Sequence, residues 1–493
     1  MNFTHALTLA LLPEAMLVGA ALISVIVAVA RPGLRPDIHR WIACIGLGGS
    51  LAACGLILLG LRGVRSGVGI TVWGGGLSVD SFSVFIAILA GVTALASCLI
   101  SDTPVRRIPA RSSAFYGLVL VATAAVDAIA AQRDMVTLFI TLALLLVCLV
   151  SIGALVKTNP RGGVSSFEHL VEGTIGTACV LYGLVLLYGV TGSTNLSVVV
   201  GAVHKAPGAV ALSVALVLLG LCASLGVFPL RQWVGRVGTN VPAGAAGFII
   251  AMSMIGGGAA LARVTVSGFG AGVKPSVWLV SVIAALALGH ASLSALRESS
   301  VSRLIGQLVS AQAAMLMLGL LALSTGSLAL PAYGMTAFLA GLGITAVATL
   351  AAYGVLAMIQ GAGIDDALTD VRGLAHRSAP AALFLSVAVA TLAGVPPLAG
   401  FLSRLLLVTS AADAGYGWLA VIATAATLLT IIAAVRFIGV LYADSGDEVP
   451  FTLGATPMVS RLVAGAACLA GLVLIVFIQP LLAVATAGAG PLR

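Results

Sequence analysis

The stretch LAGVPPLAGFLSRLLL, residues 392–407, lies in a strongly apolar part of the chain. It carries two adjacent prolines, Pro396 and Pro397, and then an arginine, Arg404, seven residues further on. Proline breaks the hydrogen bonding of a helix, and a charge is costly in hydrocarbon. The stretch therefore predicts an interrupted membrane-crossing helix, beside either a polar, hydrated cavity or a plain packing kink. Because arginine is a poor proton carrier, Arg404 either sets the electrostatics of a path or belongs to a structural ion pair.

The composition places the chain in a bilayer. Of 493 residues, 60% are hydrophobic and only 8% are charged, whereas a soluble domain carries about 25% charged residues. The chain is therefore predicted to be an all-α polytopic membrane protein, with residues 1–493 as a single integral membrane domain. Apolar runs of about 20 residues, enough to cross a bilayer, predict fourteen spans: 9–30, 41–61, 81–100, 113–131, 135–156, 169–189, 209–229, 242–263, 277–296, 304–324, 331–358, 379–411, 416–441 and 462–486.

A second predicted span is interrupted by a proline in a similar way to the span that contains Pro396 and Pro397. CASLGVFPLRQW, residues 222–233, places Pro229 and then a basic residue near the end of the seventh predicted span. Two interrupted spans, five apart, predict two inverted five-helix repeats with helices 7 and 12 broken. These repeats cover 113–263 and 277–441, preceded by three N-terminal helices and followed by the last helix at 462–486. For Pro229 alone, a simple kink is an equal alternative.

The basic residues predict the orientation in the membrane. The net charge is +8, but these residues are scattered over short loops without a basic stripe, so we expect no nucleic-acid partner. When the odd-numbered loops are placed in the cytoplasm, that side receives fifteen lysines and arginines and the other side seven. This positive-inside bias predicts that both termini are extracytoplasmic. The first apolar run has no basic region before it, which favours a retained span over a cleaved signal peptide.

The sequence offers no redox or metal centre. Its seven cysteines are odd in number, lie in apolar runs and form no CxxC pair, which argues against a disulfide framework, a zinc site or an iron–sulfur cluster. No pattern indicates a haem, flavin or nucleotide site. We therefore expect no catalytic residue, no cofactor and no metal in this chain.

Few polar side chains lie within the predicted spans. Glu168 and Glu172, four residues apart, share one helix face at the start of the sixth span and form either a proton-uptake pair or a plain interfacial pair. Asp127 and His290 lie deeper, and the histidine is either a proton relay or a packing residue. Glu14 is expected to be interfacial. All three lysines lie in loops, so any proton path must use carboxylates, His290 and water.

Five segments together resemble the antiporter-like membrane subunits of respiratory complex I. TLAGVPPLAGFLSRLLL resembles their twelfth-helix signature, and specifically the LAGIPPxAGFxxK pattern of subunit N of NADH-quinone oxidoreductase. Over residues 80–440 the likeness also includes the following blocks: VLYGLVLLYGVTGSTNLS (180–197), FPLRQWVGRVGTNVPAGAAGF (228–248), RLIGQLVSAQAAMLMLGL (303–320) and DVRGLAHRSAPAALF (370–384).

The chain departs from this family at its charged positions. In that family, the charged groups form a glutamate–lysine chain linked to proton pumping. The resemblance places Glu168 at the position of the sixth-helix lysine and Arg231 at the position of a histidine. Only the twelfth-helix position stays basic, as Arg404. The remaining family positions are replaced by Ala143, Ser224, Met254 and Gln312. The resemblance therefore implies the fold and the complex better than it implies transport.

The resemblance implies a membrane-arm subunit of a proton-translocating NADH-quinone oxidoreductase in the inner membrane of a bacterial cell. The chain would contribute a proton half-channel coupled to quinone reduction in partner subunits. Its partners would be the other complex I-type membrane subunits and the lipid bilayer, with NADH, FMN, iron–sulfur clusters and quinone elsewhere in the complex. The alternatives are a divergent scaffold subunit that does not pump, a cation/proton antiporter- or hydrogenase-type subunit of the same superfamily, and an unrelated secondary transporter.

Overall fold

The computed structural model describes residues 11–31, 35–61, 70–72, 75–101, 111–156, 160–199, 207–269, 274–321, 330–444 and 465. Apart from one short hairpin, its named elements are helices. In chain order they are α2 (Leu12–Ala30), α3 (Pro36–Leu61), β1 (Ile70–Val72), β2 (Leu77–Val79), α4 (Ser81–Ile100), α6 (Ser112–Ala131), α7 (Met135–Leu155), α8 (Pro160–Thr191), α10 (Pro207–Ser224), α11 (Gln232–Asn240), α12 (Ala243–Arg263), η3 (Val264–Phe269), α13 (Lys274–Ala295), α14 (Val301–Leu321), α15 (Leu330–Gly361), α16 (Leu374–Arg377), α17 (Ala379–Ala393), α18 (Ala399–Asp413) and α19 (Gly417–Tyr442). The strands pair antiparallel, with Ile70 opposite Val79.

The predicted polytopic helical fold is confirmed. Eleven helices of the described residues are long and apolar enough to cross a membrane. Two further predicted spans are broken helices, α10–α11 around Pro229 and α17–α18 around Pro396 and Pro397. Together these account for thirteen of the fourteen predicted spans. The predicted last helix, 462–486, lies outside the described residues, as do both termini.

Two predicted boundaries are wrong. The sixth span is predicted at 169–189, but α8 begins at Pro160, because its first turns are too polar to register as membrane-spanning. The seventh span is predicted to end at Pro229, but the chain continues beyond the break as the short helix α11, whose sequence QWVGRVGTN is mostly polar. Hydropathy finds the apolar part of a helix and not its ends.

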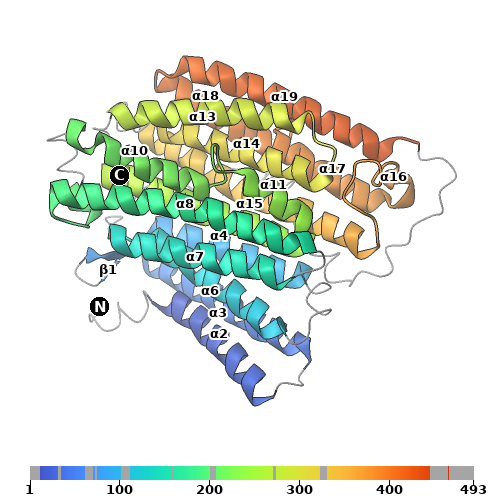
Figure 1. The fold of residues 1–493 in the computed structure, drawn as a ribbon, viewed down its shortest axis with the longest axis horizontal. Coiled ribbons are helices and arrows are strands. Elements are labelled where there is room, and N and C mark those ends of the chain that lie inside the picture. Colours follow the sequence, from blue (N-terminus) through green and yellow to red (C-terminus); the bar gives the residue numbers. More distant parts are fainter. Residues whose placement is uncertain are drawn as a thin grey trace.

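The long helices lie side by side, with α2 and α3 at one edge of the bundle and α18 and α19 at the opposite edge (Figure 1). We call the end of the bundle near β1 the hairpin end and the opposite end the α16 end. Helix α12 is buried throughout its length. Peripheral helices instead expose apolar side chains, such as Val29 of α2 at 79% and Ile45 of α3 at 74%. Such a surface suits contact with lipid or with neighbouring subunits.

Polar contacts fix the hairpin end. Asp80 caps α4, because its carboxylate accepts from the Ser83 N–H at 2.9 Å while the Ser83 hydroxyl accepts from the Asp80 N–H at 2.9 Å. Asp134 caps α7 in a similar way, with the N–H groups of Val136 and Thr137 each 3.0 Å from one carboxylate oxygen. These caps set where two neighbouring membrane helices begin.

The first broken helix packs against α8 through glycines. A Cβ atom at Gly220 of α10 would lie 2.3 Å from the carbonyl oxygen of Gly176 in α8. A Cβ atom at Gly183 of α8 would lie 2.7 Å from the carbonyl oxygen of Ser213. Such small-residue contacts let two helices approach closely in a membrane. They hold α10 in the position from which its break faces the bundle interior.

Candidate functional site

The second break places backbone polar groups inside the bundle. Helix α17 ends at Gly394, whose φ of +80° lies in the left-handed region that glycine adopts without strain. Pro396 and Pro397 lack N–H donors and follow directly, before α18 begins at Ala399. The carbonyl of Leu392 is thereby freed from its helix and becomes available to a side chain.

Arg404 uses that carbonyl. Its guanidinium is buried, with the residue 2% exposed, and donates to the Leu392 carbonyl at 2.7 Å. It also donates to the side-chain oxygen of Gln312 at 2.8 Å and to the Thr430 hydroxyl at 2.7 Å. No carboxylate of the described residues pairs with it. Three neutral protein acceptors therefore hold this cation. The predicted alternative, a structural ion pair between Arg404 and a carboxylate, is not found among the described residues.

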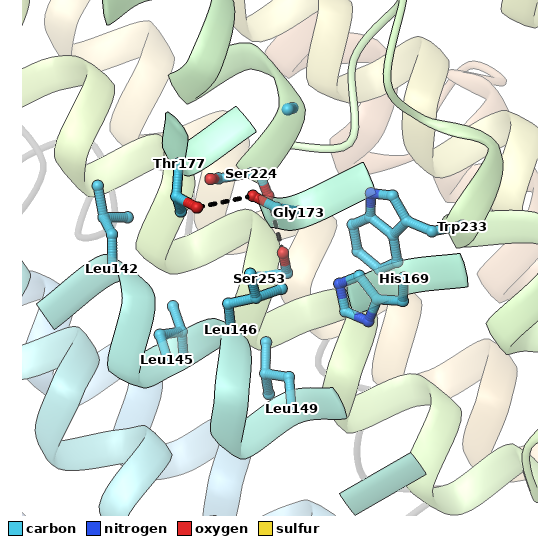
Figure 2. A pocket seen from close by; sticks show the side chains of 11 residues that line it. Leu142, Leu145, Leu146, Leu149, His169, Gly173, Thr177, Ser224, Trp233 and Ser253 are labelled. Atoms are coloured by element: carbon cyan, nitrogen blue, oxygen red, sulfur yellow. Dashed lines mark hydrogen bonds between the residues drawn. The ribbon is translucent and has the colours of Figure 1, made fainter. Parts of the chain in front are cut away.

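The first break has a different character. Ser224, which the resemblance places at a lysine position of the family, ends α10, and its freed carbonyl accepts a hydrogen bond from the Ser253 hydroxyl at 2.8 Å. A cavity of about 20 Å³ lies beside it, and Figure 2 shows its lining. That volume suits about one water molecule. The lining contains the stacked rings of His169 and Trp233, 4.1 Å apart, with Thr177 and leucines of α7. Among the described residues, this lining holds no carboxylate, lysine or arginine.

The other replaced family positions are scattered. Ala143 is half-buried on α7, and Met254 is buried in α12 one residue after Ser253. Gln312 is the exception, because it is buried on α14 and accepts the hydrogen bond of Arg404. The structure thus brings two of the family positions together at the second break.

A polar cavity of about 270 Å³ lies at the α16 end of the bundle. Arg231, just before α11, is 5% exposed and donates to the side-chain oxygen of Gln307. It also contacts Nδ1 of His290, and Gln307 in turn donates to Glu298 at 2.9 Å. The charged and polar residues lining the cavity are Arg231, Gln232, Arg236, His290, Glu298, Arg303 and Gln307.

The prediction that His290 lies deep in its span is wrong. Helix α13 ends at Ala295, so His290 lies near its end, exposed and with its ring tilted against Phe228 of the first break. The predicted span 277–296 ends within one residue of the observed helix, so the error lies in the depth assigned to His290 and not in the helix end. The histidine therefore belongs to the cavity at the α16 end.

Glu168 and Glu172 do share a face of α8, and an arginine joins them. One guanidinium nitrogen of Arg236 lies 3.1 Å from a Glu168 oxygen and 3.6 Å from a Glu172 oxygen. Glu172 also accepts from the Trp233 N–H at 3.2 Å, at the start of α11. Because Arg236 also lines the polar cavity, it connects both glutamates to Arg231 and His290.

Asp127 lies apart from these groups, at the hairpin end. It is 3% exposed on α6 and lines a cavity of about 20 Å³ together with Glu14 of α2. Glu14 is predicted to be interfacial, yet its Oε2 atom is buried without a hydrogen-bond partner in the described residues. The predicted charged candidates thus fall into three separate places.

Sequence reasoning missed Arg236, Gln307, Glu298 and a buried ion pair between Asp80 and Arg263. The ion pair has an N–O distance of 2.8 Å and side chains that are 1% and 0% exposed. Arg263 is the last residue of the predicted span 242–263 and counts among the basic residues of the membrane surface, so the sequence gives no sign of a buried partner. Within the described ranges, no group of three or more His, Cys, Asp or Glu side chains is arranged to hold a metal ion.

Comparison with known proteins agrees with this architecture. Residues 132–430 match the family described as NADH:quinone oxidoreductase/Mrp antiporter, TM. NADH-quinone oxidoreductase subunit N of Trichlorobacter lovleyi is 25% identical over 444 residues, covering 89% of this chain and 88% of that protein. A chain of respiratory complex I from Thermus thermophilus is 24% identical, with a TM-score of 0.78 over 96% of this chain and 98% of its own.

A chain of an archaeal membrane-bound sulfane sulfur reductase is 21% identical, with a TM-score of 0.84 over 97% of each chain. At these identities the solved structures establish the fold alone. The family match covers more than half of the chain and includes both broken helices. The chain therefore belongs to the NADH:quinone oxidoreductase/Mrp antiporter transmembrane family.

Proposed function

We propose that this chain is the subunit N-type membrane-arm subunit of a complex I-type NADH-quinone oxidoreductase. The family also contains antiporter subunits, and the fold is common to both. Curated relatives support the choice, because they carry the name NADH-quinone oxidoreductase subunit N and match up to 89% of this chain.

In this proposal the chain contributes a proton half-channel and no redox chemistry. NADH, FMN, iron–sulfur clusters and quinone belong to partner subunits, and this chain is a non-catalytic subunit of the enzyme. It is embedded in the bacterial inner membrane beside other complex I-type membrane subunits, with both termini extracytoplasmic. This orientation places the α16 end, with Glu168 and Glu172, on the cytoplasmic side.

The observation that carries the proposal is the buried guanidinium of Arg404 at the second break. It has no counter-ion among the described residues, so its electric field acts strongly on any charge that moves nearby. At the α16 end, Glu168, Glu172, Glu298 and His290 are groups able to take up a proton. The guanidinium of Arg404 would interact electrostatically with a proton that arrives there. It would interact in the same way with a change of charge in a neighbouring subunit.

A scaffold without pumping is the second candidate, and the first break favours it. The cavity beside Ser224 is lined mostly by leucines, small residues and two stacked rings (Figure 2). No charged group lining that cavity repeats the role of Arg404. If both breaks are needed for proton movement, the chain is a structural member of its complex.

Purification from native membranes through a tag on this chain tests the assignment. We expect the other membrane and hydrophilic subunits of an NADH-quinone oxidoreductase to co-migrate, with NADH-dependent quinone reduction in the purified fraction. Isolation of the chain alone, or with subunits of a cation antiporter and no NADH oxidation, would overturn it. The scaffold and the half-channel are separated by the proton stoichiometry of the same preparation.

A further inference from the structure

Two carboxylates meet at the hairpin end, far along the bundle from the Arg236 cluster. Glu14 of α2 and Asp127 of α6 line the same cavity of about 20 Å³. Asp127 is 3% exposed, and neither of its oxygens has a hydrogen-bond partner among the described residues. One oxygen of Glu14 is buried and unbonded in the same part of the structure. An unpaired polar side chain therefore faces a cavity next to a second carboxylate.

The described lining of this cavity contains no lysine or arginine. At this end of the bundle, the described charged and titratable groups are Glu14 of α2, the Cys54 thiol of α3, Asp80 before α4, Arg133 and Asp134 after α6, and Arg263 of α12. Of these, only Glu14 and Cys54 share the cavity lining with Asp127. Arg263 is already occupied, because its guanidinium pairs with Asp80 at 2.8 Å and donates to the Ala130 carbonyl at 2.9 Å. Within the described part of the chain, nothing neutralises a charge on Asp127.

A buried carboxylate without a donor or a cation is strongly disfavoured. Two neighbouring carboxylates disfavour the doubly ionised state further. A metal ion would find a poor site, because no group of three or more His, Cys, Asp or Glu side chains in the described part of the chain is arranged to hold one, the Cys54 thiol of this lining included. The hydroxyl of Ser83, which also lines the cavity, is engaged in the cap of α4. The cavity has room for about one water molecule. A proton satisfies these constraints at the lowest cost in free energy.

We propose that Glu14 and Asp127 form a proton-binding site and hold one proton between them at neutral pH. The site is separate from both breaks, since it lies between α2, α3, α4 and α6. In the orientation of the proposed function, this end faces away from the cytoplasm, on the side where translocated protons leave. The side of the membrane that this end faces rests on the proposed function, whereas the binding of the proton does not.

Infrared difference spectroscopy on the purified complex tests the site. Spectra are recorded between neutral and alkaline pH for the wild type, Asp127→Asn, Glu14→Gln and the control Asp413→Asn, whose carboxylate is exposed at the end of α18. We expect a carbonyl band of a protonated carboxyl group in the wild type, lost in Asp127→Asn and retained in Asp413→Asn. In Glu14→Gln the band should shift in frequency, because the neighbour of Asp127 changes from a carboxyl group to an amide.

Subtracting each variant spectrum from that of the wild type removes the other carboxyl groups of the complex. Identical spectra for the wild type, Asp127→Asn and Glu14→Gln would overturn the proposal. So would loss of the band when potassium is replaced by sodium at constant pH, because a metal ion would then be the ligand. Proton stoichiometry measured on the same variants separates this result from the proposed function, since the band reports binding whether or not protons are pumped.

Discussion

The buried arginines Arg263, Arg404 and Arg231 are held in three different ways. Arg263 has a carboxylate, Asp80, whereas Arg404 has only neutral acceptors. Arg231 lies between these cases, with Gln307 and His290 as direct partners and Glu298 one hydrogen bond further away. A fully paired arginine serves stability. An arginine without a counter-ion among the described residues costs stability and keeps an electric field in the bundle.

Removing one partner of the buried Asp80–Arg263 pair should be strongly destabilising. Arg263→Leu leaves Asp80 buried and unpaired, so we expect a loss of about 3–5 kcal/mol. The apparent melting temperature of the detergent-purified complex should fall clearly below that of the control Arg297→Leu, whose side chain is exposed. Adding Asp80→Asn to Arg263→Leu should restore part of the loss. A melting temperature equal to that of the control would show that the pair contributes little.

Asp366 should make stability depend on pH. It lies in the loop after α15, where it accepts from the hydroxyls of Ser300 and Ser302 and from the Ser302 N–H at the start of α14. Burial raises the pKa of Asp366, although the hydrogen bonds from the two serines act in the opposite direction. Ionisation is therefore harder in the folded protein than in the unfolded chain, and the wild type loses stability as the pH rises through this raised pKa.

Asp366→Asn should remove this dependence. We expect the melting temperature of the wild type, relative to that of the variant, to fall as the pH rises above about 4, the usual range for an aspartate. Below that pH, where both states carry the proton, the difference should be constant. A difference that grows in favour of the wild type with rising pH would show that the folded protein favours the ionised carboxylate instead.

Glu168 tests the cluster at the α16 end. In Glu168→Gln, Arg236 retains only Glu172 as an acidic partner, and one proton-accepting group is lost. We expect fewer protons translocated per electron, with quinone reduction retained. Reconstituted vesicles with a pH-sensitive dye provide the measurement, and Asp365→Asn, an exposed carboxylate in a loop, is the matched control. Equal proton uptake in the variant and the wild type would remove Glu168 from the path.

At the scale of elements, close packing sets the place of the first broken helix. Gly183→Val puts a branched side chain where a Cβ atom alone would lie 2.7 Å from the Ser213 carbonyl oxygen. We expect a destabilisation of about 1–3 kcal/mol, the cost of overpacking, and reduced assembly into the complex. Gly189→Val on the same helix has open space around its Cβ position and serves as the control. Similar assembly of both variants would show that α8 and α10 can move apart without cost.

The elements could be predicted from the sequence because a bilayer imposes one strong rule. Runs of about 20 apolar residues located thirteen spans that the structure describes, and prolines located both breaks. The rule fails where a helix leaves the apolar zone, as in α11 and the first turns of α8. Hydropathy also does not predict which residues meet in tertiary contacts. Arg404 and Gln312 are 92 positions apart, and Glu172 and Trp233 are 61 apart, so packing alone decides that they meet.

At the scale of the whole molecule, the charged side chains discussed above gather at three places: the two ends of the bundle and the second break. The Arg236 cluster and the polar cavity lie at the α16 end, and Glu14, Asp127 and the Asp80–Arg263 pair lie at the hairpin end. Arg404 lies at the second break, between the two ends. The central claim is that this guanidinium serves proton movement as well as packing.

The proton-to-electron ratio of the reconstituted complex tests that claim most directly. It is measured as proton uptake per NADH oxidised for the wild type, Arg404→Leu and Arg404→Lys, with assembly checked by the amount of co-purified subunits. We predict a lower ratio in Arg404→Leu and a ratio near that of the wild type in Arg404→Lys, which restores the positive charge. An unchanged ratio in fully assembled Arg404→Leu would contradict the claim and leave the chain as a scaffold.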